Sequence, residues 1–234
     1  FTYISHDLKT PLTLILSPLQ RLIQQPQISN NDKEKLEVIY RNANRMNYLI
    51  NELLTFSKIE MKQMRISVRK GDIMHFLEEL SHIFDIVAGE REIDFIVNLE
   101  DTEEEVWFSP SKLERVLYNL LSNAFKYTQP GGYVKLSAKL IKEEKETFVQ
   151  ISVKDNGRGI PKEAQEQIFE SYYQVEKRDH REGFGLGLSL TRSLIHMHKG
   201  EIRVESEINK GSDFIVTLNV SEDAYNPDER SSEN

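Results

Sequence analysis

The chain has 234 residues, of which 38% are hydrophobic and 29% charged, a composition typical of a globular protein of one or two domains. Its formal net charge of −8 argues against general binding to nucleic acid. It has no cysteine, which excludes disulfides and thiolate metal sites and fits a reducing compartment. We expect no membrane segment within it, because no apolar run approaches the roughly 20 residues that span a bilayer. The first residue is Phe1 inside a helical pattern, so we interpret the chain as a fragment of a longer protein.

Residues 1–65 predict two helices, separated by a stretch at 24–31 that has the composition of a loop. Apolar residues recur in each at alternating steps of four and three, which indicates a packing seam. The seam residues are Leu8, Leu12, Ile15, Leu19 and Leu22 in the first helix, and Leu36, Ile39, Ala43, Met46, Ile50 and Leu53 in the second. Because two helices alone enclose little core, we predict an antiparallel hairpin that forms a parallel homodimer through residues 1–60, a four-helix bundle.

From about Ile66 the pattern changes to short strands alternating with helices, which predicts a mixed α/β layer architecture over 66–220 and an α+β fold for the chain. Strands are expected at 93–99, 133–141, 148–153, 201–205 and 212–220, and helices at 74–87, 111–128, 162–169 and 186–198. Ser111 is the expected N-cap of the second of these helices, with Glu114 completing a capping box. The polar, acidic segment 221–234 predicts a flexible tail or linker.

An exposed histidine is the first candidate functional residue. His6 lies roughly opposite the seam of the first helix and should project into solvent, with Thr10 on its side. Asp7 could orient the imidazole or take its proton, which would leave the other ring nitrogen as a nucleophile. Pro11 removes the amide that would bond the Asp7 carbonyl, so we expect a bend there. Taken alone, an ordinary surface histidine would explain His6 equally well.

Three polar residues of the helix at 111–128 form a second candidate group. Asn119, Asn123 and Lys126 share one face at positions i, i+4 and i+7. Amide oxygens suit Mg²⁺, which prefers hard oxygen ligands, and the lysine ammonium suits a phosphate. An ordinary polar helix face would show the same spacing.

Two glycine-rich turns complete the candidates. The first, 155–160, follows a strand, where a buried Asp155 could accept a hydrogen bond from an adenine amino group while glycines let the backbone approach the base. The second, 183–190, leads into a helix whose free amides could hold phosphates. A dinucleotide-binding loop does not fit, because a charged segment and not a strand precedes it and the spacing is not G-x-G-x-x-G. That segment, 171–182, is the expected mobile lid, although a solvated loop would look similar.

The segment His6-Asp7-Leu8-Lys9-Thr10-Pro11-Leu12 resembles the H-box of sensor histidine kinases, usually written H-E-L-R-T-P-L. The other family motifs follow in order. The matching segments are the N-box at 119–128, the G1 box at 155–160, the F-box at Phe169, the G2 box at 183–190 and a terminal glycine motif at 210–212. Because the resemblance extends over residues 1–220, the chain is similar to the catalytic core of a sensor histidine kinase.

The resemblance implies a fold and a site. The fold is a dimeric helical hairpin followed by a two-layer α/β sandwich, the ATP-binding fold shared with gyrase-type ATPases. His6 would be the phosphoacceptor, Asp7 would assist transfer, and Thr10 would position water when the protein dephosphorylates its partner. The catalytic residues would also include Asn119 and Lys126, with Asn119 and Asn123 as Mg²⁺ ligands. The implied ATP-binding residues are Asn119, Asn123, Lys126, Tyr127, Asp155, Gly157, Gly159, Ile160, Gly183, Gly185, Leu186 and Gly187.

The implied reaction transfers the γ-phosphoryl group of Mg·ATP to a ring nitrogen of His6. Its loose transition state needs mainly positioning and charge neutralisation, here by Mg²⁺ and Lys126. The phosphoryl group would then pass to an aspartate on a response-regulator receiver domain, in trans or in the same parent chain, as in hybrid kinases. The fragment would be cytoplasmic, and the parent protein would lie in the bacterial inner membrane.

Two other functions are compatible with parts of this pattern. A mechanical ATPase of the same nucleotide fold usually carries a glutamate where this chain has Asn119, which cannot act as a base, and it lacks the His6 hairpin. A scaffold with a degenerate nucleotide site is the second alternative. The intact glycines and the retained Asn119 and Asn123 argue against it.

Overall fold

The computed structural model describes residues 2–25, 28–61, 63–174 and 185–231. The side chains of residues 2–10, 13 and 30 lie outside that description. None of the helices in these ranges is both long enough and apolar enough to cross a membrane.

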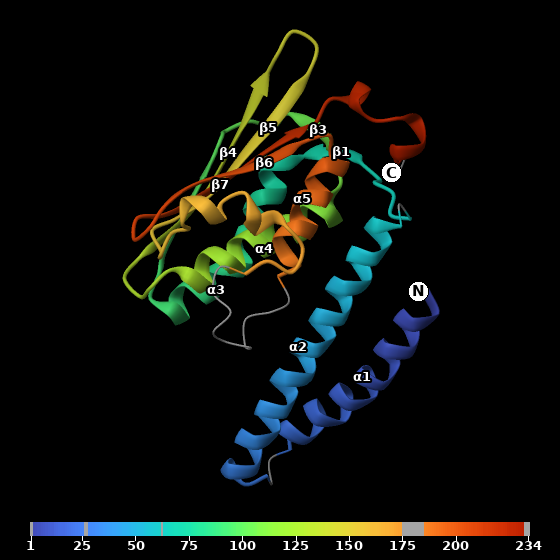
Figure 1. Ribbon diagram of the computed structural model, residues 1–234, viewed down its shortest axis with the longest axis vertical. Helices are drawn as coiled ribbons and strands as arrows, with labels where there is room; N and C mark the ends of the chain where they lie inside the picture. Colours follow the sequence, from blue (N-terminus) through green and yellow to red (C-terminus); the bar gives the residue numbers. More distant parts are fainter. Residues whose placement is uncertain (1, 26–27, 62, 175–184, 232–234) are drawn as a thin grey trace.

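The first two helices form the predicted hairpin. Helix α1 (Thr2–Ile23) and helix α2 (Asn30–Glu60) run antiparallel (Figure 1). The Ser29 hydroxyl caps α2 by accepting a hydrogen bond from the Asp32 N–H at 3.2 Å, which satisfies one of the free amides at the helix start. Helix α1 continues through both Pro11 and Pro18.

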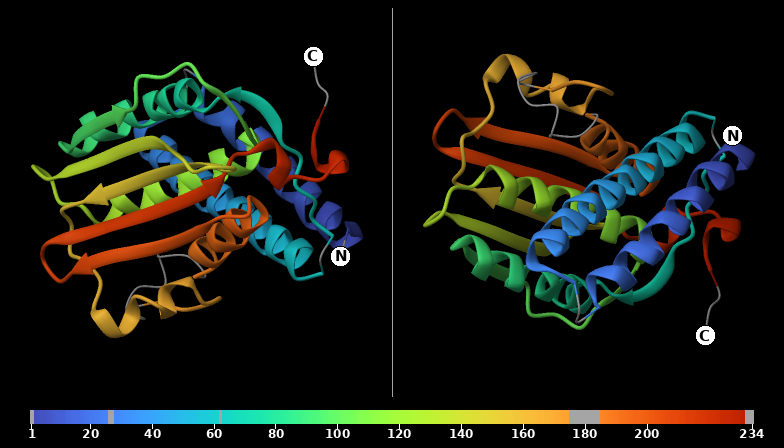
Figure 2. Two further views of the ribbon diagram at one scale, coloured as in Figure 1. Left: turned by 90° about the horizontal axis from the view of Figure 1, so that it is seen from above. Right: turned by 90° about the horizontal axis from the view of Figure 1, so that it is seen from below.

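The remainder of the chain is a two-layer sandwich, as predicted. Its sheet has the order β2-β4-β5-β7-β6, and it is mixed because β2 pairs parallel with β4 while all other pairs are antiparallel. The strands are β2 (Asp94–Leu99), β4 (Tyr133–Lys142), β5 (Thr147–Asp155), β6 (Glu201–Glu207) and β7 (Gly211–Asn219). Helices α3 (Ile73–Arg91), α4 (Pro110–Tyr127) and α5 (Gly187–Met197) cover one face, and the hairpin lies on this helical side (Figure 2).

The core lies between these helices and the sheet. Its residues recur with the helix period on one side and with the strand period on the other. Helix α4 buries the leucines at 113, 117, 120 and 121, while β5 buries alternate residues at 149, 151 and 153. This packing holds the polar face of α4 beside the ends of β5 and β7. The arrangement positions the candidate site.

The N-cap of helix α4 lies two residues earlier than the sequence predicts. It is Ser109, and Pro110 occupies the first turn, so the capping box expected at Ser111 and Glu114 is wrong. Proline is favoured there because its fixed φ suits a helix and its missing N–H would have had no helical partner. The Ser109 N–H instead donates to Nε2 of the buried His198 at 3.2 Å.

Two further elements differ from the sequence prediction. Residues 162–169 form two 3₁₀ turns, η1 (Lys162–Ala164) and η2 (Gln167–Phe169), and not one helix. The separate turns let Ala164, Ile168 and Phe169 all reach the core. Strands β1 (Arg69–Asp72) and β3 (Glu105–Phe108) form a small antiparallel pair that was not predicted. Four residues are too few for an alternating pattern to be recognised.

Residues 221–231 do not form the flexible tail that the sequence predicts. Two 3₁₀ turns, η3 (Glu222–Ala224) and η4 (Pro227–Glu229), bring Tyr225 into a buried position, where only 1% of it is exposed. Its hydroxyl donates to the Asn219 carbonyl at 2.6 Å. The tail therefore contributes an anchored aromatic ring to the fold.

The same tail packs against the segment that leaves the hairpin. The Val68 N–H donates to the Glu229 carbonyl at 2.8 Å, and the Ser231 N–H donates to the Val68 carbonyl at 2.8 Å. Val68, Ile66 and Tyr225 form a small buried cluster of their own. The connection between hairpin and sandwich is thus held by residues from the far end of the described chain.

We expect Tyr225→Ala to lower the free energy of unfolding of the sandwich by about 3–5 kcal/mol, as for other buried aromatic side chains. Tyr225→Phe, which loses only the hydroxyl, should lower the free energy of unfolding by about 1–3 kcal/mol, because the buried carbonyls that accept from this hydroxyl lose their donor. Urea unfolding followed by the fluorescence of Trp107, the sole tryptophan, measures both. Wild-type stability of Tyr225→Ala would contradict the packing of the tail.

Candidate active site

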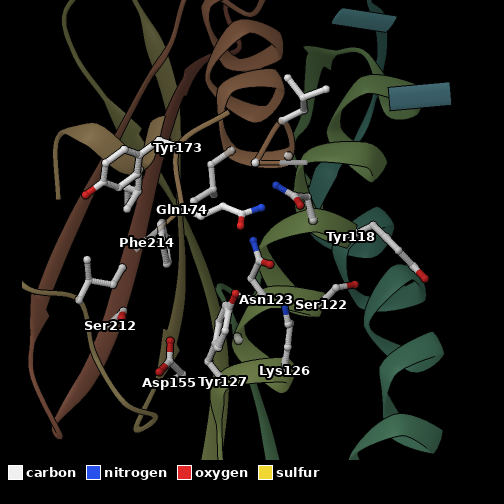
Figure 3. A pocket seen from close by; sticks show the side chains of 18 of the residues that line it. Tyr118, Ser122, Asn123, Lys126, Tyr127, Asp155, Tyr173, Gln174, Ser212 and Phe214 are labelled. Carbon is white, nitrogen blue, oxygen red and sulfur yellow. Dashed lines mark hydrogen bonds between the residues drawn. The ribbon is translucent and has the colours of Figure 1, made fainter. Parts of the chain in front are cut away.

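A cavity of about 580 Å³ opens between α4, the turn after β5, the start of α5 and helix α2 of the hairpin. Figure 3 shows the part of its wall that α4 and the sheet form. The volume of the cavity suits a small-molecule ligand. It brings together most of the nucleotide-site residues predicted from sequence. Those that line it are Asn119, Asn123, Lys126, Tyr127, Asp155, Gly159, Ile160, Gly185, Leu186 and Gly187.

Asp155 ends β5 and faces this cavity with only 4% of its surface exposed. Burial raises the pKa of its carboxyl, while hydrogen bonds from the backbone N–H groups of Gly157 and Ser212 act against that rise. The Gly157 N–H lies 2.8 Å from Asp155 Oδ1. A buried carboxylate held in this way keeps capacity to accept a further hydrogen bond from a ligand.

Gly157 lies beside the cavity, where a close backbone contact leaves no room for a side chain. A Cβ at this position would lie 2.4 Å from the Tyr127 carbonyl oxygen. The turn after β5 therefore packs directly on the last turn of α4. This contact brings Asp155 and Tyr127 to the same end of the cavity.

Asn119 lies at the opposite end, against the start of α5. Its side-chain nitrogen donates to Thr191 Oγ1 at 2.8 Å, and a Cβ on Gly187 would lie 2.6 Å from its side-chain oxygen. The bond to Thr191 thus fixes the orientation of the Asn119 amide, and the side-chain oxygen takes no part in that bond. This oxygen lies beside the N-terminus of α5, where backbone amides favour anions.

The amide pair fits a magnesium ion that retains waters and substrate phosphate oxygens. Asn119 and Asn123 lie one helical turn apart on α4 and both line the cavity. Across the described part of the chain, no cluster of three or more His, Cys, Asp or Glu could hold a metal ion. A two-amide site without carboxylates suits Mg²⁺ only where a phosphate ligand completes the shell.

Two cations flank the aromatic ring of Tyr127. The Lys126 ammonium lies 3.1 Å from the Tyr127 hydroxyl and 4.8 Å from the ring centroid, and the Arg158 guanidinium lies 4.3 Å from the same centroid. Both cations line the cavity. Arg158 was not among the residues predicted from sequence, because its position between two glycines carries no signal for stacking on Tyr127.

The histidine segment lies on the other domain. The backbone at His6, Asp7 and Thr10 belongs to α1, and the side chains of these residues are outside the description. The described lining of the cavity includes no residue of α1. Gly183 and residues 175–182 of the predicted lid also fall outside the described ranges.

Four residues of α2 that were not predicted line the cavity: Asn44, Arg45, Tyr48 and Glu52. The sequence does contain a signal for them. Tyr48, Glu52 and Thr55 recur at i, i+4 and i+7 on the face of α2 opposite the apolar seam. Tyr173, Gln174, Ser212 and Phe214 complete the wall near the sheet (Figure 3).

A helical hairpin joined to a mixed-sheet sandwich, with a buried carboxylate, two amides and glycine turns around one cavity, defines the class of ATP-binding proteins that includes histidine kinases. Residues 108–222 match the family model of the histidine kinase-, DNA gyrase B- and HSP90-like ATPases. Residues 1–62 match the model of the His Kinase A (phospho-acceptor) domain. The chain belongs to the histidine kinase family, and its second domain is an ATP-binding domain.

Individual relatives agree with this assignment. The chain is 37% identical over 223 residues to histidine kinase P4 of Formosa agariphila, and the alignment covers 93% of this chain and 16% of that protein. It is 32% identical over 232 residues to the hybrid signal transduction histidine kinase D of Dictyostelium discoideum, covering 96% and 15%. The structure of full-length ShkA in complex with AMPPNP superposes with a TM-score of 0.80 at 24% identity, covering 94% of this chain and 45% of that one. The chain thus spans less than half of each of these proteins.

Proposed function

We propose that the chain transfers the γ-phosphoryl group of ATP to His6 and then to an aspartate of a response-regulator receiver domain. The observation that supports this most is the match of residues 1–62 to a phospho-acceptor domain whose H-box contains His6, in one chain with the Asp155 cavity. The proposed division is a phosphotransfer hairpin at 1–65 and an ATP-binding domain at 66–220.

In the proposed reaction, a lone pair on one His6 ring nitrogen attacks the γ-phosphorus as the bond to the β–γ bridging oxygen breaks, and ADP leaves with both electrons. Asp7 holds or accepts the proton of the other ring nitrogen, which keeps the attacking nitrogen unprotonated. Lys126 supplies positive charge to the phosphates, and Asp155 holds the adenine amino group. When bound between Asn119 and Asn123, Mg²⁺ would neutralise charge on the phosphate oxygens.

The nature of residue 119 favours a kinase over an ATPase. An amide cannot take a proton from water, so Asn119 is suited to metal binding and not to hydrolysis. With ATP labelled in its γ-phosphate, a kinase incorporates label into the chain up to about one phosphate per His6. Steady release of inorganic phosphate without labelled protein would support an ATPase instead.

A second copy of the chain is the proposed partner of the hairpin. Seam residues are uncovered in the single chain, with Ile15 and Ile39 each 49% exposed and Met46 54% exposed. A parallel four-helix bundle through residues 1–60 would bury them.

Thr10 would serve a phosphatase reaction toward the same response regulator, because its side chain would position the attacking water.

We expect Met46→Asp to convert the dimer to a monomer, because an unpaired charge buried in the seam costs several kcal/mol. Val38→Asp is the matched control, since Val38 is an exposed apolar residue of α2 outside the seam. Size-exclusion chromatography with light scattering, at a chain concentration of roughly tens of micromolar, distinguishes the two variants. A monomeric wild-type chain would contradict the bundle and leave phosphorylation in cis.

The wider setting is also a proposal. The receiver domain is in trans or in the same parent chain, nucleic acid does not contact this fragment directly, and the fragment contains no membrane segment. The fragment is cytoplasmic and its parent lies in the bacterial inner membrane. Transfer of label from the phosphorylated chain to a purified receiver domain on a time scale of seconds to minutes would identify the regulator.

A further inference from the structure

Helix α2 presents two different faces. At 100° per residue, the cavity-lining positions 44, 45, 48 and 52 fall within an arc of about 100°. The seam positions 39, 43, 46, 50 and 53 lie on the roughly opposite side. The helix can therefore pair with a second copy through one face while the other face closes the nucleotide cavity.

Polar contacts hold this second face against the ATP-binding domain. The Arg115 guanidinium on α4 donates to Thr55 Oγ1 at 2.8 Å and to the Asn51 carbonyl at 3.4 Å. The Tyr48 hydroxyl donates to Glu52 Oε1 at 2.9 Å, and only 5% of Glu52 is exposed. The two Arg115 contacts are half-buried and join segments 60 and 64 residues apart, so they hold α2 against the ATP-binding domain, while the Tyr48–Glu52 bond orders the face of α2 between them and the cavity.

A second contact joins α2 to the glycine turn that opens α5. The Phe56 ring meets the Tyr172 ring edge-on, with centroids 6.2 Å apart. The Tyr172 N–H donates to the Gly185 carbonyl at 2.9 Å. Helix α2 therefore contacts both sides of the cavity, at α4 and at the segment packed on Gly185.

The end of the cavity that α2 closes is the one away from the adenine site. Arg115 lies in the first half of α4 and Asn119 at its middle, whereas Tyr127 and Asp155 mark the opposite end. Tyr118 and Tyr127 are nine residues apart, which is about 14 Å along a helix. Figure 3 shows Tyr127 toward Asp155, with Tyr118 farther along α4. The α2 wall is thus next to Asn119 and the start of α5, where the phosphates would lie.

We propose that Arg45, from the hairpin, binds the terminal phosphate of ATP in the cavity of its own chain. This rests on the proposed nucleotide site. Arg45 is half-buried, lines the cavity and precedes Tyr48 by one turn on the same face. A guanidinium keeps its charge at all relevant pH values and offers paired donors to phosphate oxygens. Tyr48, Glu52 and Arg115 are positioning residues that hold this stretch of α2 in place.

The test compares ligands that differ in phosphate number, measured by calorimetry with Mg²⁺ on the whole chain. Arg45→Ala should weaken a non-hydrolysable ATP analogue about 10-fold and ADP less, and should leave adenosine unchanged, because only the terminal phosphate loses a charged partner. Arg45→Lys should retain part of the affinity. Arg41→Ala is the matched control, an exposed arginine on α2 outside the cavity lining.

The outcomes separate this inference from the proposed function. Equal affinity of wild type and Arg45→Ala for the ATP analogue would overturn it, as would an equal loss for all three ligands, which indicates a structural effect. Asp155→Asn measured alongside should weaken all three ligands. If it does while Arg45→Ala has no effect, the nucleotide site stands without the α2 wall. If Asp155→Asn also has no effect, the nucleotide site itself is wrong.

Discussion

His6→Gln should abolish incorporation of phosphate from ATP and leave the nucleotide affinity of the chain unchanged. Glutamine has a similar length and polarity but no nitrogen with a nucleophilic lone pair, so the acceptor is lost. The described lining of the cavity comes from residues 44–52 of α2 and from the ATP-binding domain, so binding should not depend on His6. Filter-bound label and calorimetric ADP titration measure the two quantities separately.

A matched control uses an exposed histidine of the ATP-binding domain. His75 lies on α3 with a 63% exposed side chain, paired with Glu79, and His75→Gln should incorporate phosphate as the wild type does. Label retained in His6→Gln would show that the acceptor is elsewhere. Label lost together with ADP binding would indicate a folding defect and not a lost nucleophile.

Asp155→Asn should weaken ADP and ATP binding by about 10- to 150-fold, the loss expected for a buried hydrogen bond to a charged group. A carboxylate can only accept, whereas the asparagine amide can present a donor to the adenine amino group. Asp94→Asn is the control, because Asp94 is an exposed carboxylate at the start of β2. Unchanged ADP affinity in Asp155→Asn would mean that Asp155 is only a turn residue.

The stability of the same variant distinguishes lost binding from lost folding. Burial raises the pKa of Asp155, so the folded state holds this proton more tightly than the unfolded state. Its contribution to stability is therefore full below the unfolded value of 3.8 and is lost as pH rises through the folded value. At neutral pH the ionised carboxylate costs stability, and Asp155→Asn without nucleotide should unfold at no lower urea concentration than wild type.

Local periodicity was enough to predict much of the fold. The seam steps of four and three gave the hairpin, and the alternation of apolar residues in 148–153 gave β5 because that strand is buried between two neighbours. The i, i+4, i+7 spacing of Asn119, Asn123 and Lys126 placed all three on one face, and all three line the cavity. Each of these features depends on residues close together in the sequence.

The missed features depend on contacts between distant residues. Arg115 and Thr55 are 60 positions apart, and neither has a local pattern that pairs it with the other. Tyr225 lies in a polar segment, and its burial depends on acceptors at Asn219 and His198 that only the folded chain supplies. A sequence pattern shows which face is apolar, but it does not show which element covers that face.

The most direct test of a histidine kinase is the chemical nature of the phosphoryl linkage. After incubation of the wild-type chain with Mg²⁺ and ATP labelled in its γ-phosphate, we predict label that survives base and is lost in acid, as for a phosphoramidate. Peptide mapping under mild conditions should place it on the peptide that contains His6. Label that survives acid, or that maps to a peptide without His6, would contradict the account.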